Sequence, residues 1–450
     1  MTEERLHRTW LHSERTVPRR FVRPILRFTQ IEASGGLVML AAAVVALIWA
    51  NSTWGDSYTH FWETEFSLEI GSFHFNESLV ELVNDGLMVI FFYVVGLEIK
   101  RELVMGDLRD PKAAALPAIG ALGGMVLPAL LYVLIVGGGE ASRGWGIPMA
   151  TDIAFSVGVL SLLGRRVPVG AKLFLLTLAI VDDIGAILVI AVFYTDELFL
   201  GWLGLALAGL LIIWLAGRAG IRSLAFYLVA AIATWFFLLE SGVHATLAGV
   251  ALGFLTPAAA MYSDKDYQER AGRILKRQVF DAEAPLAAQR LDSDALEMSA
   301  VARESVAPLN RMEHALLPWS SFVIVPIFAL ANAGVDFRGV DFGAAITHPV
   351  ALGVAIGLLV GKTIGISVFS FVAVKLGFAR LPRNTGWNHI IGTAAIAGIG
   401  FTVALFVTAL AFDPGELADR AKTGIFLGSI AAGLVGTAFL RIRKPGADRS

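Results

Sequence analysis

Long apolar stretches separated by short polar breaks dominate the sequence. Residues 37–50, 113–136, 200–216 and 351–361 contain no charged side chain. A helix needs about 20 mostly apolar residues to cross the hydrocarbon core of a membrane, which is about 30 Å thick, because it rises about 1.5 Å per residue. The apolar segments and their breaks therefore predict an all-α polytopic membrane protein with twelve transmembrane helices. Their centres fall near Val44, Val89, Met125, Asp152, Asp183, Ala208, Ala231, Val250, Pro326, Gly361, Gly400 and Ile430.

Lysine and arginine orient these spans, because they are retained preferentially on the cytoplasmic side. If both termini are cytoplasmic, the outside segments hold only Arg143, Arg338, Arg420 and Lys422 of the 36 basic residues. Lys362 falls inside a span, and all the others lie in cytoplasmic segments. This strong bias favours twelve spans with both ends in the cytoplasm.

Composition narrows the possible functions. Hydrophobic residues make up 56% of the chain and charged residues 16%, whereas soluble domains usually contain about 25% charged residues. The chain has no cysteine, which excludes thiol catalysis and zinc-thiolate sites. A net charge of -2 with dispersed basic residues argues against a nucleic-acid partner.

Two polar loops differ from the rest. In the first outside loop, apolar residues alternate with polar ones over 66–70 and again over 73–75, with Gly71-Ser72 between them. Glycine at the first central position suits a type II′ turn, so we expect a small outside β-hairpin. The cytoplasmic loop 261–317 is rich in charge and alanine with weak periodicity, and we expect a largely mobile tether. The expected organisation is a cytoplasmic N-terminal extension, 1–30, a transmembrane domain, 31–440, and a cytoplasmic tail, 441–450.

Ionisable residues inside spans are the candidate functional residues. Asp182 and Asp183 lie midway along the fifth span, and a charge at the centre of a helix costs about 2.5 to 3.5 kcal/mol on insertion scales. Because neighbouring helical residues point about 100° apart, one carboxylate can line a cavity while the other meets a partner helix. Lys362, near the middle of the tenth span, is expected to pair with one of them, since a buried ammonium needs a counter-charge.

Two spans contain residues that break helices. The fourth combines Pro148 with Thr151 and Asp152, and proline removes a backbone hydrogen-bond donor. The eleventh contains Gly398, Gly400 and Thr402. Helices 3–5 and 10–12 are offset by seven spans, an odd number, so the two triplets run in opposite directions. The pattern predicts an inverted repeat whose middle helices, 4 and 11, are discontinuous and form an ion site at the membrane midplane.

The tenth span also has a glycine every fourth residue, at Gly353, Gly357, Gly361 and Gly365. This spacing places glycine along one helix face, where a neighbouring helix can approach closely. We interpret the stripe as a packing surface.

At these motifs the sequence closely resembles the NhaA-type sodium/proton antiporters of bacteria, which are themselves among the transporters known to have inverted repeats and broken helices. The resemblance runs from about Gly35 to Leu440. Its specific motifs are NDGLMVIFFYVVGLEIKREL from Asn84, ATDIAFSVGVLSLLG from Ala150, LAIVDDIGAI from Leu178, SGVHATLAG from Ser241, FALANAGV from Phe328, GKTIGIS from Gly361 and GIGFT from Gly398.

The resemblance implies a role for each matching residue. Asp183 matches the direct Na+ ligand, and Asp182 matches the acid that pairs with Lys362. Thr151 and Asp152 match the broken-helix motif, in which the aspartate offsets the positive helix ends and the threonine offers oxygen to the ion. A pH-sensing cluster and cytoplasmic funnel would comprise Glu98, Glu102, His244, Glu313 and His314. The second helix break would comprise Gly398, Gly400 and Thr402.

The implied protein is a secondary transporter and not an enzyme. It would exchange cytoplasmic Na+, and Li+, for external H+ by alternating access, under pH regulation and without a cofactor. Its place would be the bacterial inner membrane, among lipids, as a homodimer joined through the 66–75 hairpin.

Other classes share the buried acids. An intramembrane aspartyl protease fits poorly, because the acids are adjacent and its Tyr-Asp and Gly-x-Gly-Asp pairings are absent. A passive cation channel would not need two broken helices in opposite repeats. A symporter for an organic solute is the nearest alternative, although no basic or aromatic pocket is evident.

Overall fold

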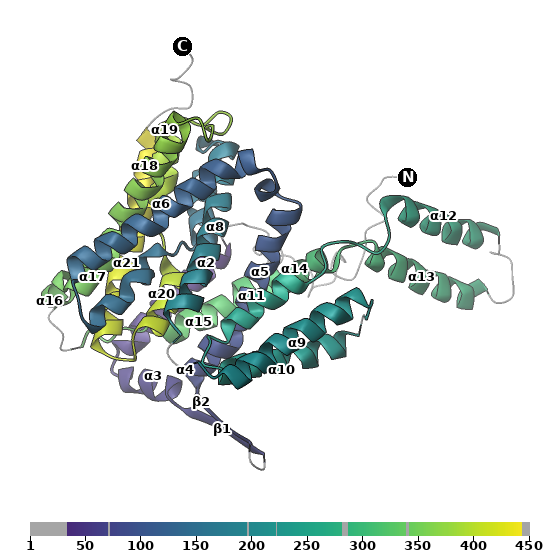
Figure 1. The fold of residues 1–450 in the computed structure, drawn as a ribbon, viewed down its shortest axis with the longest axis horizontal. Helices are drawn as coiled ribbons and strands as arrows, with labels where there is room; N and C mark the ends of the chain where they lie inside the picture. Colours follow the sequence, from purple (N-terminus) through teal and green to yellow (C-terminus); the bar gives the residue numbers. More distant parts are fainter. Residues whose placement is uncertain are drawn as a thin grey trace. The chain divides into compact units, whose positions relative to one another are not determined.

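The computed structural model describes residues 34–442 except 71–72, 196–197, 222, 281–286 and 339–341. Helices account for nearly all of the regular structure in this part of the chain (Figure 1). The extension 1–30 and nearly all of the tail lie outside the described residues. The chain divides into two compact units, and each is described by itself. Unit 1 contains Met1–Met88, Asp110–Asp196 and Pro318–Ser450, and unit 2 contains Val89–Arg109 and Glu197–Leu317.

Unit 1 is built from long apolar helices interrupted by breaks and by turns of altered pitch. The elements η4, η8 and η9 are π-helical, whereas η6 and η7 are 3-10 helices. The unit contains α2 (Ser34–Ala50), α3 (Gly55–Trp62), β1 (Glu65–Ile70), β2 (Phe73–Ser78), α4 (Leu79–Glu81), η4 (Leu82–Leu87), α6 (Pro111–Val136), η6 (Glu140–Met149), α7 (Ile153–Leu163), η7 (Gly164–Arg166), α8 (Val169–Phe193), η8 (Ser320–Ile324), α15 (Val325–Asn332), α16 (Phe342–Thr347), α17 (Pro349–Ile356), η9 (Gly357–Gly361), α18 (Lys362–Lys375), α19 (Trp387–Ile396), α20 (Phe401–Ala411) and α21 (Glu416–Ile442).

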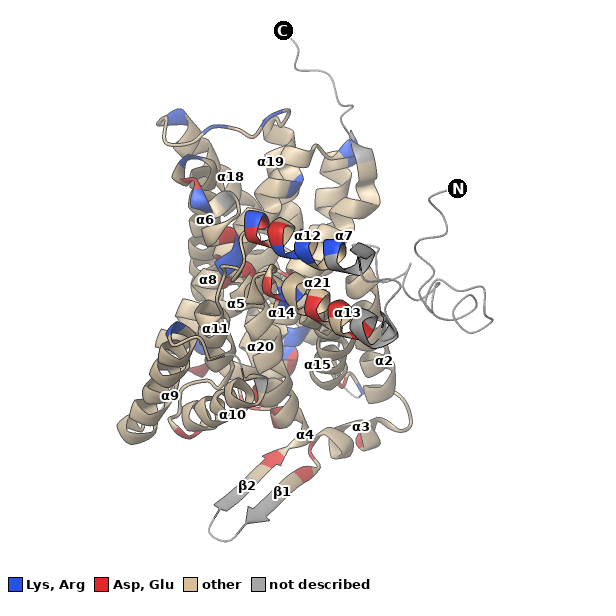
Figure 2. Cartoon of the chain, turned by 90° about the vertical axis from the view of Figure 1, so that its right-hand side faces the viewer, with Lys and Arg blue, Asp and Glu red and all other residues tan. Residues whose placement is uncertain are grey.

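Unit 2 holds the remaining helices. Its α9 and α10 are apolar and lie side by side, whereas charged residues gather on α12 and α13 (Figures 1 and 2). The unit contains α5 (Met88–Val104), η5 (Asp107–Arg109), α9 (Leu200–Arg218), α10 (Leu224–Glu240), α11 (Thr246–Leu255), α12 (Asp264–Phe280), α13 (Ala287–Glu304) and α14 (Pro308–Trp319).

Seven helical stretches in the described part of the chain are long and apolar enough to cross a membrane. Three helix pairs, bent by 115°, 40° and 47° at short breaks, raise the number to as many as ten. These pairs are α2 with α3, η6 with α7, and α19 with α20. The shorter apolar helices α10 and α11 lie where the seventh and eighth spans are expected. A helical membrane protein is therefore confirmed, while the count of twelve and the inverted repeat stay predictions.

The loop 261–317 contains regular helices where we expected a largely mobile tether. Helices α12 and α13 pack against each other, and each buries an apolar residue, Ile274 at 1% and Val301 at 6% exposure. Alanine, glutamate, lysine and arginine all have high helix propensity, so weak hydrophobic periodicity did not exclude helices here. The helices were not predicted, and the expectation that this loop is a largely mobile tether stays a prediction.

The small β-hairpin is confirmed. Strands β1 and β2 pair antiparallel, with Leu68 opposite Phe75 and Ile70 opposite Phe73. The expected type II′ turn at Gly71-Ser72 lies outside the described residues.

Glycines let α6 pack closely against η9 and α18. A Cβ atom at Gly365 would lie 2.1 Å from the carbonyl oxygen of Gly123, and one at Gly361 would lie 2.8 Å from Cα of Pro128. Such contacts are too short for real atoms, so neither position accepts a side chain without separating the helices. The interpretation of the glycine stripe as a packing surface is confirmed.

Gly365→Ala is therefore expected to destabilise the protein by about 1–3 kcal/mol, because overpacking forces two backbones apart. Gly204→Ala on α9 is the matched control, since nothing lies within 4 Å of a Cβ there. That change is expected to be neutral or stabilising, because alanine suits a helix better than glycine. Thermal unfolding of both variants in detergent checks this, and equal melting temperatures would contradict the packing role.

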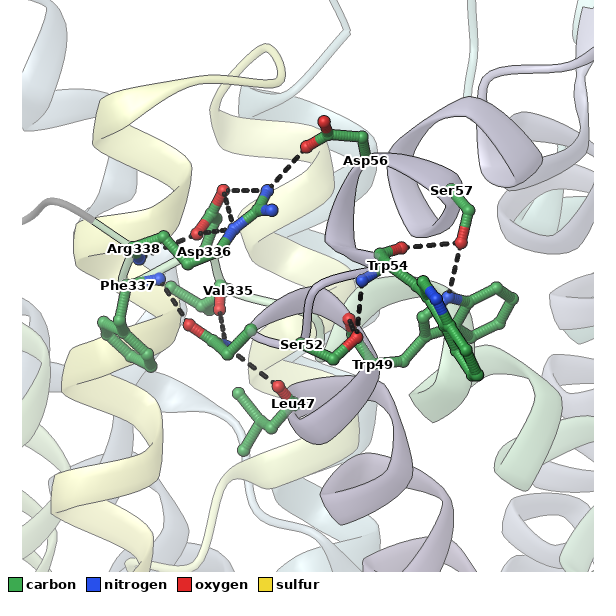
Figure 3. A network of polar contacts seen from close by, with 11 residues as sticks. Leu47, Trp49, Ser52, Trp54, Asp56, Ser57, Val335, Asp336, Phe337 and Arg338 are labelled. Atoms are coloured by element: carbon green, nitrogen blue, oxygen red, sulfur yellow. Dashed lines mark hydrogen bonds and ion pairs between the residues drawn. The ribbon is translucent and has the colours of Figure 1, made fainter.

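A polar network fixes the segment that follows α15 (Figure 3). The side chain of Asn51 donates to the carbonyl of Val335 at 2.7 Å and accepts from the backbone N–H of Phe337 at 2.8 Å. Arg338 forms ion pairs with Asp336 at 2.8 Å and Asp56 at 2.9 Å. Hydrogen bonds from Arg338 lower the pKa of the Asp336 carboxyl. The network ties α2 and α3, which precede the hairpin, to the end of α15.

Candidate functional site

The breaks in two bent helix pairs meet inside unit 1. The first break lies between η6 and α7, at 150–152, and the second between α19 and α20, at 397–400. The backbone N–H of Asp152 donates to the carbonyl of Ile399 at 2.7 Å. Ser156 Oγ donates to the carbonyl of Ile396 at 3.1 Å. Backbone groups freed by one break are thus satisfied by the other, which non-helical backbone requires inside a membrane.

Asp152 caps both half-helices that begin at these breaks. Its Oδ1 accepts from the backbone N–H of Phe155 in α7 at 2.9 Å. Its Oδ2 accepts from the backbone N–H and the hydroxyl of Thr402 in α20, at 3.1 and 2.5 Å. A helix N-terminus carries a partial positive charge, so one carboxylate stabilises two such ends. The side chain is 2% exposed.

A buried ion pair lies beside this crossing. Lys362 Nζ donates to Asp182 Oδ2 and, at 2.6 Å, to Thr151 Oγ1. Thr151 Oγ1 has one proton and two acceptors within reach, Asp182 Oδ2 at 2.6 Å and the carbonyl of Ala397 at 2.9 Å. Lys362, Asp182 and Thr151 are each 0% exposed. The threonine therefore links the ion pair to the crossing of the breaks.

Two adjacent carboxyl groups belong to this region. Asp182 Oδ1 is buried and has no hydrogen-bond partner among the residues that the structure describes. Asp183 follows on the same helix, α8, and is 6% exposed. Carboxylate, hydroxyl and backbone carbonyl oxygens are the ligands that hard cations prefer. A carboxylate offers the same lone pairs to a proton.

Glycines at the second break make room for η9 and for the first break. A Cβ at Gly398 would lie 2.3 Å from the carbonyl oxygen of Leu358, and one at Gly400 would lie 3.1 Å from that of Ala150. Leu358 belongs to η9, the π-helical turn that ends directly before Lys362. This turn was not predicted from the sequence. Such turns often occur at functional sites, and this one directly precedes Lys362.

The acidic residues expected to sense pH lie in unit 2. Arg101 forms ion pairs with Glu313 and, at 3.4 Å, with Glu102. Glu98 is half-buried and lies within electrostatic range of all three. The structure thus brings Glu98, Glu102 and Glu313 together around the guanidinium of Arg101, a residue that was not predicted to belong to this cluster.

The two histidines do not share one position. His244 precedes the N-terminus of α11. Lys100, which lies between Glu98 and Glu102 in the sequence, contacts the other end of this helix. Its ammonium group donates to the carbonyls of Phe254 and Thr256, at 2.7 and 2.5 Å. A ten-residue helix is about 15 Å long, so His244 is separated from the acidic cluster. His314 is exposed next to Glu313. Lys100, which satisfies two helix-terminal carbonyls, was missed because its sequence context suggests only solvated charge.

Comparison with known proteins gives consistent matches along the chain. The model of a family described as Na+/H+ antiporter 1 matches residues 26–440. The Na+/H+ antiporter NhaA of Syntrophobacter fumaroxidans is 45% identical over 94% of this chain and 90% of its own. The NhaA antiporter of Koribacter versatilis is also 45% identical, over 93% of this chain and 91% of its own. That of Rhodopirellula baltica is 45% identical over 94% of both chains.

Proposed function

Because the chain belongs to the Na+/H+ antiporter family that includes NhaA, we propose that it exchanges cytoplasmic Na+ for external H+ at the Asp182 and Asp183 carboxylates. Members of this family are integral membrane transporters and not enzymes. The finer proposal is that Asp183 is the direct Na+ and H+ ligand and that Asp182 is the counter-charge of Lys362.

The observation that carries this proposal is the buried group of Asp182, Lys362 and Thr151 at the crossing of two broken helices. A lysine that already neutralises one carboxylate leaves the adjacent Asp183 to supply the second negative charge. Thr151 and the carbonyls freed at the breaks offer neutral oxygen ligands. A single carboxylate can hold Na+ or H+ but not both, so competition is sufficient for exchange.

In this mechanism the site stays near the midplane while access to it alternates. Na+ from the cytoplasm displaces a proton from Asp183, the helices that carry the breaks rearrange, and external protons displace Na+. Asp152 holds the two half-helix ends together throughout, because its carboxylate accepts from both. The cycle forms no covalent bond and consumes no nucleotide.

Regulation, location and assembly complete the proposal. The Arg101 cluster in unit 2, with Glu98, Glu102 and Glu313, is proposed to make transport depend on cytoplasmic pH. Li+, a harder and smaller cation, is proposed as a second substrate. The protein would lie in the bacterial inner membrane with both termini cytoplasmic, as a dimer joined through the 66–75 hairpin.

Everted membrane vesicles containing the protein test this function. After respiration establishes a pH gradient, addition of NaCl is expected to dissipate it, reported by a ΔpH-sensitive dye, while choline chloride leaves it unchanged. A current that persists without a proton gradient would indicate a channel instead. Absence of any response to Na+ and Li+ between about pH 6 and 9, the range in which histidines and perturbed carboxylates titrate, would contradict the proposal.

A further inference from the structure

The outer half of the first broken helix has an unusual geometry. The 3-10 helix η6 is 10 residues long, whereas such helices rarely exceed three or four residues because their hydrogen bonds are poorly aligned. A 3-10 helix rises about 2.0 Å per residue and an α-helix about 1.5 Å, so η6 would be about 5 Å shorter as an α-helix. Its last residue, Met149, stands two positions before Thr151. The length of η6 therefore decides where Thr151 lies.

Two buried tyrosines hold the outer part of η6. Tyr132 of α6, 0% exposed, donates its hydroxyl proton to the carbonyl of Ala141 at 2.8 Å. Tyr194, at the end of α8 and 3% exposed, donates to the carbonyl of Arg143 at 2.7 Å and accepts from the backbone N–H of Gly146 at 3.1 Å. A change to an α-helix would shorten η6 by about 5 Å and move these backbone groups away from the two hydroxyls. The bonds therefore favour the longer 3-10 form.

The fit between η6 and the tyrosines is close. A Cβ at Gly144 would lie 2.3 Å from the Tyr132 hydroxyl, and one at Gly146 would lie 2.6 Å from that of Tyr194. Between these glycines, Trp145 stacks on the Tyr194 ring with centroids 6.4 Å apart. In the present position of η6, each tyrosine hydroxyl therefore faces a glycine.

The inner end of η6 is attached to the ion site. Thr151 contacts Asp182 and Lys362, and the N–H of Asp152 contacts Ile399. Because α8 carries both Asp182 and, at its end, Tyr194, the tyrosine fixes η6 relative to the same helix that bears the carboxylates.

We propose that Tyr132 and Tyr194 are positioning residues for the ion site: their hydroxyls hold η6 extended so that Thr151 reaches Asp182 and Lys362. This assignment rests on the proposed exchange, because its functional effect is on Na+ affinity. Without the hydroxyls, η6 relaxes toward an α-helix and draws Thr151 away, so a bound Na+ loses an oxygen ligand.

A spin-label distance and transport kinetics test this together. The chain has no cysteine, so labels at Glu140→Cys and Leu162→Cys, both exposed positions, report the length of η6 plus α7. In the Tyr132→Phe/Tyr194→Phe variant the distance is expected to shorten by up to about 5 Å. The apparent KM for Na+ in proteoliposomes is expected to rise about tenfold, with the maximal rate within about twofold, since three hydrogen bonds to η6 are lost.

Tyr227→Phe is the matched control, because its hydroxyl also donates to a carbonyl, that of Ile221 at 2.9 Å, but in unit 2. This variant is expected to change neither the spin-label distance nor the apparent KM for Na+. Tyr194→Phe alone removes two of the three contacts and serves if the double variant does not fold.

An unchanged distance or an unchanged KM in a folded Tyr194→Phe variant would overturn the proposal, as would equal effects from Tyr227→Phe. If the wild type shows no Na+-dependent exchange, the proposed function fails, while the distance still decides whether the tyrosines hold η6.

Discussion

Asp183→Asn is expected to lower Na+-dependent proton exchange by more than about a hundredfold, since more than about 2.7 kcal/mol of ion stabilisation disappears with the charge. Asparagine retains the shape of the side chain and one carbonyl oxygen, but it binds no proton in the physiological range. Both halves of the exchange therefore fail together. Because the ion pair between Lys362 and Asp182 is retained, the protein is expected to remain folded.

The ΔpH assay in everted vesicles measures this effect, with Asp413→Asn as the control. Asp413 is an exposed acid between α20 and α21, and the 11 residues of α20 separate it from the second break. The control is expected to exchange like the wild type. Exchange by Asp183→Asn at half the wild-type rate or more would remove Asp183 from the ion site.

Lys362→Met is expected to destabilise the fold by about 3–5 kcal/mol, because it leaves the Asp182 carboxylate buried without its counter-charge. Both side chains are 0% exposed, so water does not compensate for the loss. Methionine matches the length of the lysine stem, which limits the effect of packing. Lys362→Met/Asp182→Asn is expected to recover most of the stability, since removing both partners of a buried pair is often neutral.

Thermal unfolding of the purified variants in detergent separates these outcomes. The single variant should melt well below the wild type, and the double variant should melt close to it. If the two variants melt at the same reduced temperature, the ion pair is not the source of the stability, and the lysine contributes through packing alone.

Much of the site could be located from the sequence because charge inside an apolar span is costly and therefore rare. That rule alone identified Asp182, Asp183, Asp152 and Lys362. It could not decide which atoms meet: the double cap by Asp152 and the bridging position of Thr151 depend on how two breaks far apart in the chain cross each other. Periodicity fixes the faces of each helix, but it does not fix the contacts between helices.

Elements of altered pitch were not predictable. The 3-10 helix η6 contacts Tyr194, and the π-turn η9 before Lys362 contacts Gly398, and sequence patterns do not connect these neighbours. The helices α12 and α13 were missed for a different reason: their residues favour helix by propensity, although their hydrophobic pattern is weak. His244 was grouped with the acidic cluster through resemblance, and the structure places it at the other end of α11.

The central claim is that Na+ and H+ compete for one carboxylate, and proton release on Na+ binding tests it most directly. Purified protein in lightly buffered detergent solution is mixed with NaCl, and a pH indicator follows the released protons. The wild type is expected to release protons in proportion to the Na+ bound, and Asp183→Asn is expected to release none. Undiminished release from Asp183→Asn, or Na+ binding by the wild type without proton release, would contradict the account.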